Sequence, residues 1–130
     1  MSIASDRKAI SDALRTGLGQ HLTVLDYAPA TAQPLSAWLD LVSVAPGKTF
    51  RSLTATWEVI ITTTASARPD TAATALDGAL DRAIAAIVAS GAADLDNVGA
   101  YIGLTNNSSG GVIPAARITL KSSTPVKGME

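Results

Sequence analysis

The sequence LTATWEVIITTT at residues 53–64 decides the fold, because its apolar side chains alternate with mostly polar ones. This period of two is typical of a strand with one buried face. The threonines and the β-branched aliphatic residues add strand propensity. The predicted buried face comprises Leu53, Ala55, Trp57, Val59 and Ile61.

A helix of about 20 residues is predicted directly after this strand. Pro69 suits a first helical turn, Asp70 favours the positive end of the helix, and Gly91 suits its C-terminal cap. Gly78 in the interior costs about 1 kcal/mol relative to alanine. The predicted apolar face comprises Ala73, Leu76, Leu80, Ile84, Ile87 and Val88.

These two apolar faces are predicted to pack against each other, together with the last strand of the chain. We therefore expect one shared core that contains Trp57, Val59, Ile61, Leu76, Leu80, Ile84 and Ile118.

Two strands are predicted at the C-terminal end, Val98–Thr105 and Val112–Ser123, joined by a polar loop at Asn106–Gly111. Pro114 has no backbone donor. Either Val112 and Ile113 lie outside the regular strand, or the strand begins along a sheet edge.

The N-terminal half predicts a helix and two strands. Ser2 or Ser5 can cap the helix, and Gly17 and Gly19 are expected to end it. Its apolar face comprises Ile3, Ile10, Ala13, Leu14 and Leu18. The strands are Leu22–Tyr27 and Ala37–Val44, with a loop at Ala28–Pro34 between them, and the second strand is expected to place Trp38, Asp40, Val42 and Val44 on one face.

The predicted element order is therefore α-β-β-β-α-β-β. Clustered strands with separate helices favour an α+β fold, in which two helices pack on a mostly antiparallel sheet. At 130 residues, of which 47% are hydrophobic, the chain can bury one core, so residues 1–130 are expected to form a single domain.

Composition excludes several functional classes. Ten basic and eleven acidic residues are scattered along the chain, so there is no basic stripe for sequence-specific nucleic-acid binding. The absence of cysteine excludes disulfides and thiolate metal sites. No apolar segment approaches the length of a membrane span, and no signal peptide is evident, so we expect a soluble protein made in a cytoplasm.

Three strings imitate functional motifs. Gly47-Lys48-Thr49 looks like the end of a P-loop, but a strand follows it, so a hairpin turn at residues 45–48 is favoured. Gly17-Leu18-Gly19 begins like a dinucleotide fingerprint but ends a helix. Two glycosylation sequons at residues 106–109 lie in a predicted loop.

Titratable residues offer few catalytic sets. His21 is the single histidine, and we interpret it as a residue at the negative end of the first helix. Two carboxylate pairs remain, Asp77 with Asp81 and Asp94 with Asp96. Asp77 and Asp81 form either a solvated acidic face or a surface directed at a partner or a water-filled channel. No catalytic, metal or cofactor site is predicted.

The overall layout resembles the tail-terminator proteins of long-tailed bacteriophages. The resemblance rests on the short N-terminal helix, the threonine-rich strand that ends in Ile60-Ile61-Thr62-Thr63-Thr64, the second helix, and a closing strand with the sequence VIPAARITL at residues 112–120. It covers nearly the whole chain but includes no diagnostic motif.

The resemblance implies a structural virion protein of the tail neck, made in the host cytoplasm, with no enzymatic activity and no cofactor. Such a protein forms a hexameric ring, caps the tail tube, ends its polymerisation and provides a docking face for the head-tail connector, while DNA passes through without specific binding. The alternatives are a head-tail joining protein, a tail-tube subunit, or a small bacterial ligand-binding domain of the α+β class.

Loop position suggests where such a subunit contacts its partners. Lys48, Phe50 and Arg51 lie around the predicted turn between two strands, and Phe50 is a large apolar residue flanked by positive charge. Asn106 and Asn107 lie at the tip of the last predicted hairpin. We expect these five residues to contact protein partners.

Overall fold

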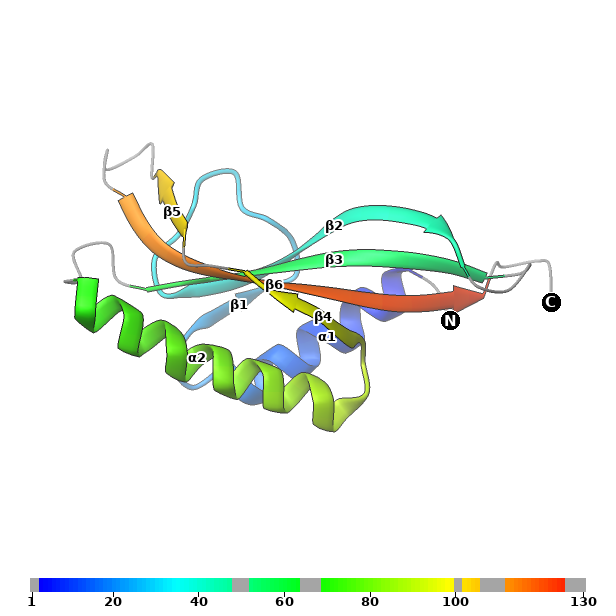
Figure 1. The fold of residues 1–130 in the computed structure, drawn as a ribbon, viewed down its shortest axis with the longest axis horizontal. Helices are drawn as coiled ribbons and strands as arrows, with labels where there is room; N and C mark the ends of the chain where they lie inside the picture. The colour runs from blue at the N-terminus through cyan, green and yellow to red at the C-terminus, as the bar shows by residue number, and fades with distance from the viewer. Residues whose placement is uncertain (1–2, 48–51, 64–68, 100–101, 106–111, 126–130) are drawn as a thin grey trace.

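The computed structural model describes residues 3–47, 52–63, 69–99, 102–105 and 112–125. Within these residues the chain forms two helices and six strands (Figure 1). The helices are α1 (Ile3–Leu18) and α2 (Pro69–Ser90). The strands are β1 (Thr23–Leu25), β2 (Ser36–Pro46), β3 (Ser52–Thr62), β4 (Asp94–Val98), β5 (Ile102–Thr105) and β6 (Val112–Pro125).

The described strands form one sheet in the order β1-β2-β3-β6-β4, and β5 also pairs with β6. Every pairing is antiparallel except that of β1 with β2. Both helices lie on the same side of the sheet (Figure 1). The predicted α+β class, with two helices on a mostly antiparallel sheet, is confirmed.

The core lies between β3 and the helices, as predicted. Ala55, Trp57, Val59 and Ile61 are fully buried, because their alternation turns all four toward the helices. Leu76, Leu80 and Ile118 belong to the same cluster, while Ile84 is only partly buried against it.

The predicted apolar face of α2 is wrong at Val88, which is 65% exposed. The helix instead buries Ala72, Ala79 and Ala83 together with its leucines. Because alanines occur on all sides of this helix, the sequence pattern identifies the buried side through Leu76, Leu80 and Ile87 but does not fix how far that side extends.

The ends of the helices differ in how well they were predicted. Gly91 follows α2 with a φ of 68°, and its N–H donates to the Ile87 carbonyl (3.1 Å), as expected of a C-terminal cap. Ser5 lies inside α1, so its assignment as a cap is wrong; Ser2 lies outside the described residues.

The helix α1 ends at Leu18, so the predicted stop at Gly17 and Gly19 is confirmed, with Gly17 as the penultimate residue of the helix. A Cβ atom at this position would lie only 2.7 Å from the Arg82 carbonyl oxygen of α2. The glycine therefore permits a close approach of the two helices.

The predicted strand Val98–Thr105 is wrong in its extent. The structure contains two short strands, β4 and β5, that pair with successive parts of β6. The register of β4 shifts between Leu95 and Asn97, so a bulge at Asp96 hides the alternation that would have predicted this strand.

The prediction that Trp38, Asp40, Val42 and Val44 share one face of β2 is wrong at Val44, because this strand also contains a bulge. The register shifts between Leu41 and Ser43, after which Val44 pairs with Ala55 on the helix side of the sheet. Trp38 and Asp40 share the opposite side, as predicted, whereas Val44 does not join them.

Pro114 lies within β6, so the second of the two predicted alternatives holds: before Ala115 the strand pairs with β5 alone among the described strands and starts along a sheet edge. The Pro114 carbonyl accepts a hydrogen bond from the Thr63 N–H (3.1 Å), just beyond the end of β3. Pro114 has no backbone N–H that could donate to the Thr63 carbonyl in return. That carbonyl instead accepts a hydrogen bond from the Leu35 N–H (3.3 Å).

The predicted hairpin between β2 and β3 is present, but the turn placed at residues 45–48 is wrong, because Ala45 and Pro46 lie in β2 and pair with Thr54 and Leu53. Gly47 N–H donates to the Ser52 carbonyl (2.9 Å), and β2 runs antiparallel to β3. None of the described helices is both long enough and apolar enough to span a membrane.

Candidate functional site

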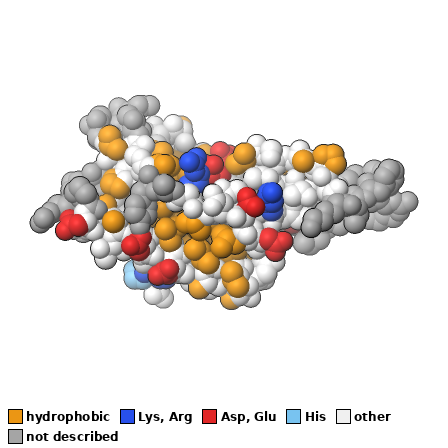
Figure 2. Space-filling model, viewed as in Figure 1, with side chains coloured by type: hydrophobic (Ala, Val, Ile, Leu, Met, Phe, Trp, Pro, Cys, Tyr) orange, Lys and Arg blue, Asp and Glu red, His pale blue; other side chains and the backbone are white. Residues whose placement is uncertain are grey.

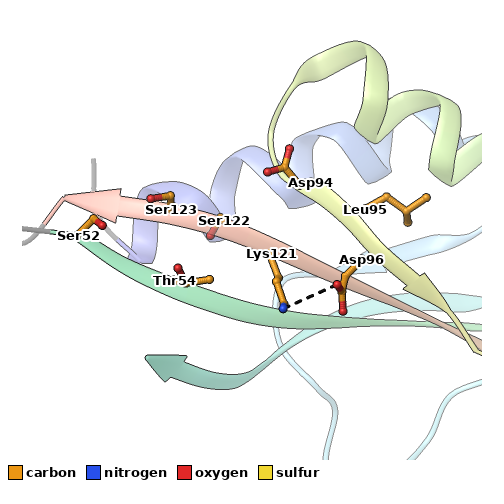
Figure 3. A pocket seen from close by; sticks show the side chains of 8 residues that line it. All are labelled: Ser52, Thr54, Asp94, Leu95, Asp96, Lys121, Ser122 and Ser123. Atoms are coloured by element: carbon orange, nitrogen blue, oxygen red, sulfur yellow. Dashed lines mark ion pairs between the residues drawn. The ribbon is translucent and has the colours of Figure 1, made fainter. Parts of the chain in front are cut away.

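A cleft of about 430 Å³ lies where β3, β6 and β4 run side by side, near the turn that joins α2 to β4 (Figure 3). Most of its lining side chains are charged or carry hydroxyl groups. They are Ser52, Thr54, Asp94, Leu95, Asp96, Lys121, Ser122 and Ser123.

One ion pair crosses this cleft. Lys121 Nζ lies 3.7 Å from Asp96 Oδ1, and both side chains are nearly half exposed. The Asp94 carboxylate points away from this pair (Figure 3). The predicted carboxylate pair, Asp94 and Asp96, thus lines one cleft, but only Asp96 forms an ion pair with Lys121.

Ser122 connects this cleft to the core. Its Oγ accepts a hydrogen bond from Trp57 Nε1 (2.9 Å) and donates one to Asp6 Oδ2 (3.1 Å). Asp6 lies in the first turn of α1, where the helix dipole stabilises a carboxylate. All three residues are buried, so this chain of hydrogen bonds fastens the start of α1 to the sheet.

A second groove, of about 270 Å³, lies beside the C-terminal end of α1 and the N-terminal half of α2. His21 and Arg82 provide its nitrogen groups, while threonines and small apolar residues form the rest. His21 is exposed, and its backbone N–H donates to the Leu18 carbonyl (2.9 Å), which confirms its position at the end of the helix. Leu35, at the edge of this groove, has a φ of 49°.

Among the residues that the structure describes, no group of three histidine, aspartate or glutamate side chains could hold a metal ion. His21 therefore has no companion ligands within the described part of the chain.

Arg15 joins α1 to the residues after β1. Its Nη2 donates to Asp26 Oδ1 (2.7 Å). This guanidinium holds the pKa of the Asp26 carboxyl below its usual value. The pair lies at the surface, so it orients α1 but contributes little stability.

The other predicted site residues are only partly placed by the structure. Asp77 and Asp81 are exposed on α2, one turn apart, and neither lines either cavity. The predicted contact residues Lys48, Phe50, Arg51, Asn106 and Asn107, and the glycosylation sequons, lie outside the described residues.

The structure also contains an apolar surface that the sequence did not predict. Leu95 and Val98 of β4 are 43% and 38% exposed, and Val88 of α2 is more exposed still. On the face of the molecule that Figure 2 shows, hydrophobic side chains gather beside the C-terminal part of α2. Because β4 was not predicted, its contribution to this surface could not be anticipated.

No family model matches this chain, and no curated protein is similar enough to count as a relative.

Proposed function

We propose that this protein is a structural subunit of a phage virion that closes into a ring and caps the tail tube. In this role it ends polymerisation of the tube and provides the docking face for the head-tail connector. The proposal assigns the protein to the neck region of the tail and gives it no reaction and no cofactor.

The observation that carries this proposal is a sheet with two open edges. Among the described strands, β4 pairs with β6 alone. The strand β1 pairs only with Ser36–Trp38 of β2, Arg7 binds the next outward carbonyl at Leu39, and no described strand pairs with the outer edge of β2 beyond it. Open strand edges have free backbone donors and acceptors that can pair with another chain. Contacts between two different edges are head-to-tail, and such contacts close into rings when the rotation between subunits permits.

The larger cleft supports a contact role better than a catalytic one. Its lysine is paired with Asp96, and the Ser122 hydroxyl is engaged on both sides by Trp57 and Asp6. A nucleophilic serine needs a base that can accept its proton, and no histidine lines this cleft.

The proposal assigns partners to surfaces by position. A hexameric ring contacts the tail-tube protein on one face and the connector on the other, through Lys48, Phe50, Arg51, Asn106 and Asn107. The exposed pair Asp77 and Asp81 faces the central channel, where negative charge keeps passing DNA from binding.

Tube growth measures the proposed activity directly. Tail-tube subunits are polymerised with and without the protein, and tube lengths are measured by electron microscopy. We expect shorter tubes that carry a ring at one end. Tubes that elongate unchanged would contradict the proposal, and polymerisation of this protein by itself would instead identify it as a tube subunit.

A further inference from the structure

The groove between the C-terminal end of α1 and the N-terminal half of α2 has a different chemical character from the larger cleft. Its volume is about 270 Å³, and His21 and Arg82 line it together with threonines and small apolar residues. None of its described lining residues is acidic. In the larger cleft, by contrast, the Lys121 ammonium group is already paired with Asp96. The groove is therefore the cavity with an excess of hydrogen-bond donors.

Arg82 is the cationic group of this groove. The other described arginines, Arg7, Arg15 and Arg117, each bind a carbonyl or carboxylate oxygen of the protein. Within the described part of the chain, the Arg82 side chain has no hydrogen bond and no ion pair. Its guanidinium N–H groups are therefore available to a ligand.

The Arg82 side chain and His21 reach the groove from two neighbouring helices. Arg82 Nη1 lies 3.4 Å from the point that a Cβ atom of Gly78 would occupy, so the side chain runs back along α2 toward its start. The C-terminal end of α1 lies beside the same part of α2, where the Gly17 backbone contacts the Arg82 carbonyl (Figure 1). His21 lies just beyond this end of α1, and it lines the groove together with Arg82.

The threonine hydroxyls of the groove differ in their hydrogen bonding. Thr62 Oγ1 accepts from the Ser36 N–H (2.9 Å), and Thr74 Oγ1 donates to the Asp70 carbonyl (3.0 Å). Thr71 forms no side-chain hydrogen bond within the described residues. It lies in the first turn of α2, where the helix dipole favours an anion. The available polar groups are thus a guanidinium, an imidazole and one hydroxyl, and all three can donate.

The apolar part of the groove includes a residue with a strained backbone, Leu35. Its φ is 49°, in the left-handed region that bulky side chains rarely adopt. The Leu35 N–H donates to the Thr63 carbonyl (3.3 Å), and its carbonyl accepts from the Thr23 N–H (3.1 Å), so both of its backbone groups are held. The side chain is nevertheless 49% exposed and lines the groove. An exposed leucine held in this way can cover the apolar part of a ligand.

These groups suit a carboxylate better than a phosphate. A guanidinium can donate to both oxygens of a carboxylate in parallel, and an imidazole can donate one further hydrogen bond. A phosphate dianion would need more positive charge than one arginine and one histidine provide. The side chains of Leu22, Leu35 and Ala75 form an aliphatic wall beside these donors, which favours a ligand with an apolar body.

We propose that this groove binds a carboxylate on a short aliphatic chain. Arg82 and His21 donate to the carboxylate oxygens, with the Thr71 hydroxyl as an additional donor, and Leu35 covers the aliphatic part. The carboxylate belongs either to a small organic acid or to the C-terminal residue of a partner polypeptide, since both have this chemistry. The inference goes beyond the proposed ring function and does not depend on it.

His21 provides a direct probe of binding, because it is the single histidine of the chain. Its imidazole signals are followed by NMR at constant pH and ionic strength while isocaproate is added. We expect saturable shifts with isocaproate and none with isocaproamide, which has the same shape without the charge. No saturable shift with the acid, or equal shifts with the amide, would overturn the inference.

The role of Arg82 is tested by a substitution that removes only its charge. Arg82→Gln should weaken the binding of isocaproate at least about tenfold, because it removes charge-assisted hydrogen bonds. Arg117→Gln is the matched control, because it changes the net charge equally at an ion pair with Glu58 on β6, outside the groove. Arg82 is exposed, so the variant should stay folded, and circular dichroism verifies this. Equal losses of affinity in the two variants would overturn the inference.

The role of Leu35 is tested by a residue that tolerates the same backbone conformation. Asparagine adopts the left-handed region more readily, so Leu35→Asn keeps the backbone and removes the aliphatic side chain. We expect this variant to lose part of the preference of the groove for isocaproate over acetate. An unchanged preference in the folded variant would contradict the assignment of the aliphatic part to Leu35.

Two short peptides that end in leucine separate the two sources of the carboxylate. One has a free C-terminus and the other an amidated one. Binding of isocaproate and of the free peptide, but not of the amidated one, supports capture of the C-terminus of a partner polypeptide. Binding of isocaproate without either peptide supports a small organic acid. Equal shifts with both peptides would show that the groove does not recognise the carboxylate, which would overturn the inference.

Discussion

Gly17 of α1 and Gly78 of α2 have different surroundings, although glycine has a low helix propensity at both positions. A Cβ at Gly17 would lie 2.7 Å from the Arg82 carbonyl oxygen, which belongs to the rigid backbone of α2. A Cβ at Gly78 would lie 3.4 Å from Arg82 Nη1, the movable end of a long side chain. Gly17 is therefore required by helix packing, whereas Gly78 is not required by any steric contact described here.

We predict opposite effects of alanine at these two positions. Gly17→Ala should lower the free energy of unfolding by about 1 to 3 kcal/mol, because the helices must move apart. Gly78→Ala should raise it by up to about 1 kcal/mol, because alanine favours the helix and restricts the unfolded chain. Chemical denaturation of both variants measures the difference, and stabilisation by Gly17→Ala would show that the helices do not approach closely there.

At the scale of elements, α2 is attached to the sheet by one face and exposed on the other. Leu80 is 8% exposed within the core, whereas Val88, two turns later, is 65% exposed. The two positions therefore provide a matched comparison of aliphatic truncations in the same helix.

Leu80→Ala should lower the free energy of unfolding by about 2 to 5 kcal/mol, because it leaves a cavity between α2 and β3. Val88→Ala should change it by less than about 0.5 kcal/mol in the isolated subunit. Denaturation midpoints of the two variants provide the measurement. Equal effects would mean that α2 does not pack on the sheet through the face that contains Leu80.

At the scale of the whole molecule, the proposed ring places the exposed carboxylates of Asp77 and Asp81 along its central channel. Asp77 and Asp81 are exposed, so replacing both should leave the fold intact. We predict that Asp77→Lys with Asp81→Lys makes assembled rings retain DNA at low salt and release it as salt rises. Lys8→Ala with Asp12→Ala, an exposed pair on α1, is the control that preserves net charge. Rings of the Asp77 and Asp81 double variant that bind no more DNA than this control would place these residues outside the channel.

Local pattern in the sequence determined most of the elements. The alternation of residues 53–64 and the apolar periodicity before Gly91 depend on neighbours within a few residues, so a single segment contains the whole signal. The α+β class followed from the order of these segments, and the shared core of Trp57, Leu76 and Ile118 followed from their facing sides.

The candidate site was less accessible from sequence. Asp94 and Asp96 were singled out as a pair, but their cleft is built with Lys121 and Ser122 from a strand more than 20 residues away along the chain. The open apolar edge was missed, because the bulge at Asp96 interrupts the alternation of β4.

By itself, then, the sequence determined the type of each long element, the buried side of β3 and the absence of disulfide chemistry. Only the tertiary structure decided that Gly17 is a packing position, that bulges turn Val44 and the end of β4, and that β4 lies at an open edge of the sheet. The physical reason is that propensity, periodicity and caps arise from interactions within one segment. Close approach, register and edge exposure instead arise between segments that are distant along the chain, and they exist only after those segments have paired.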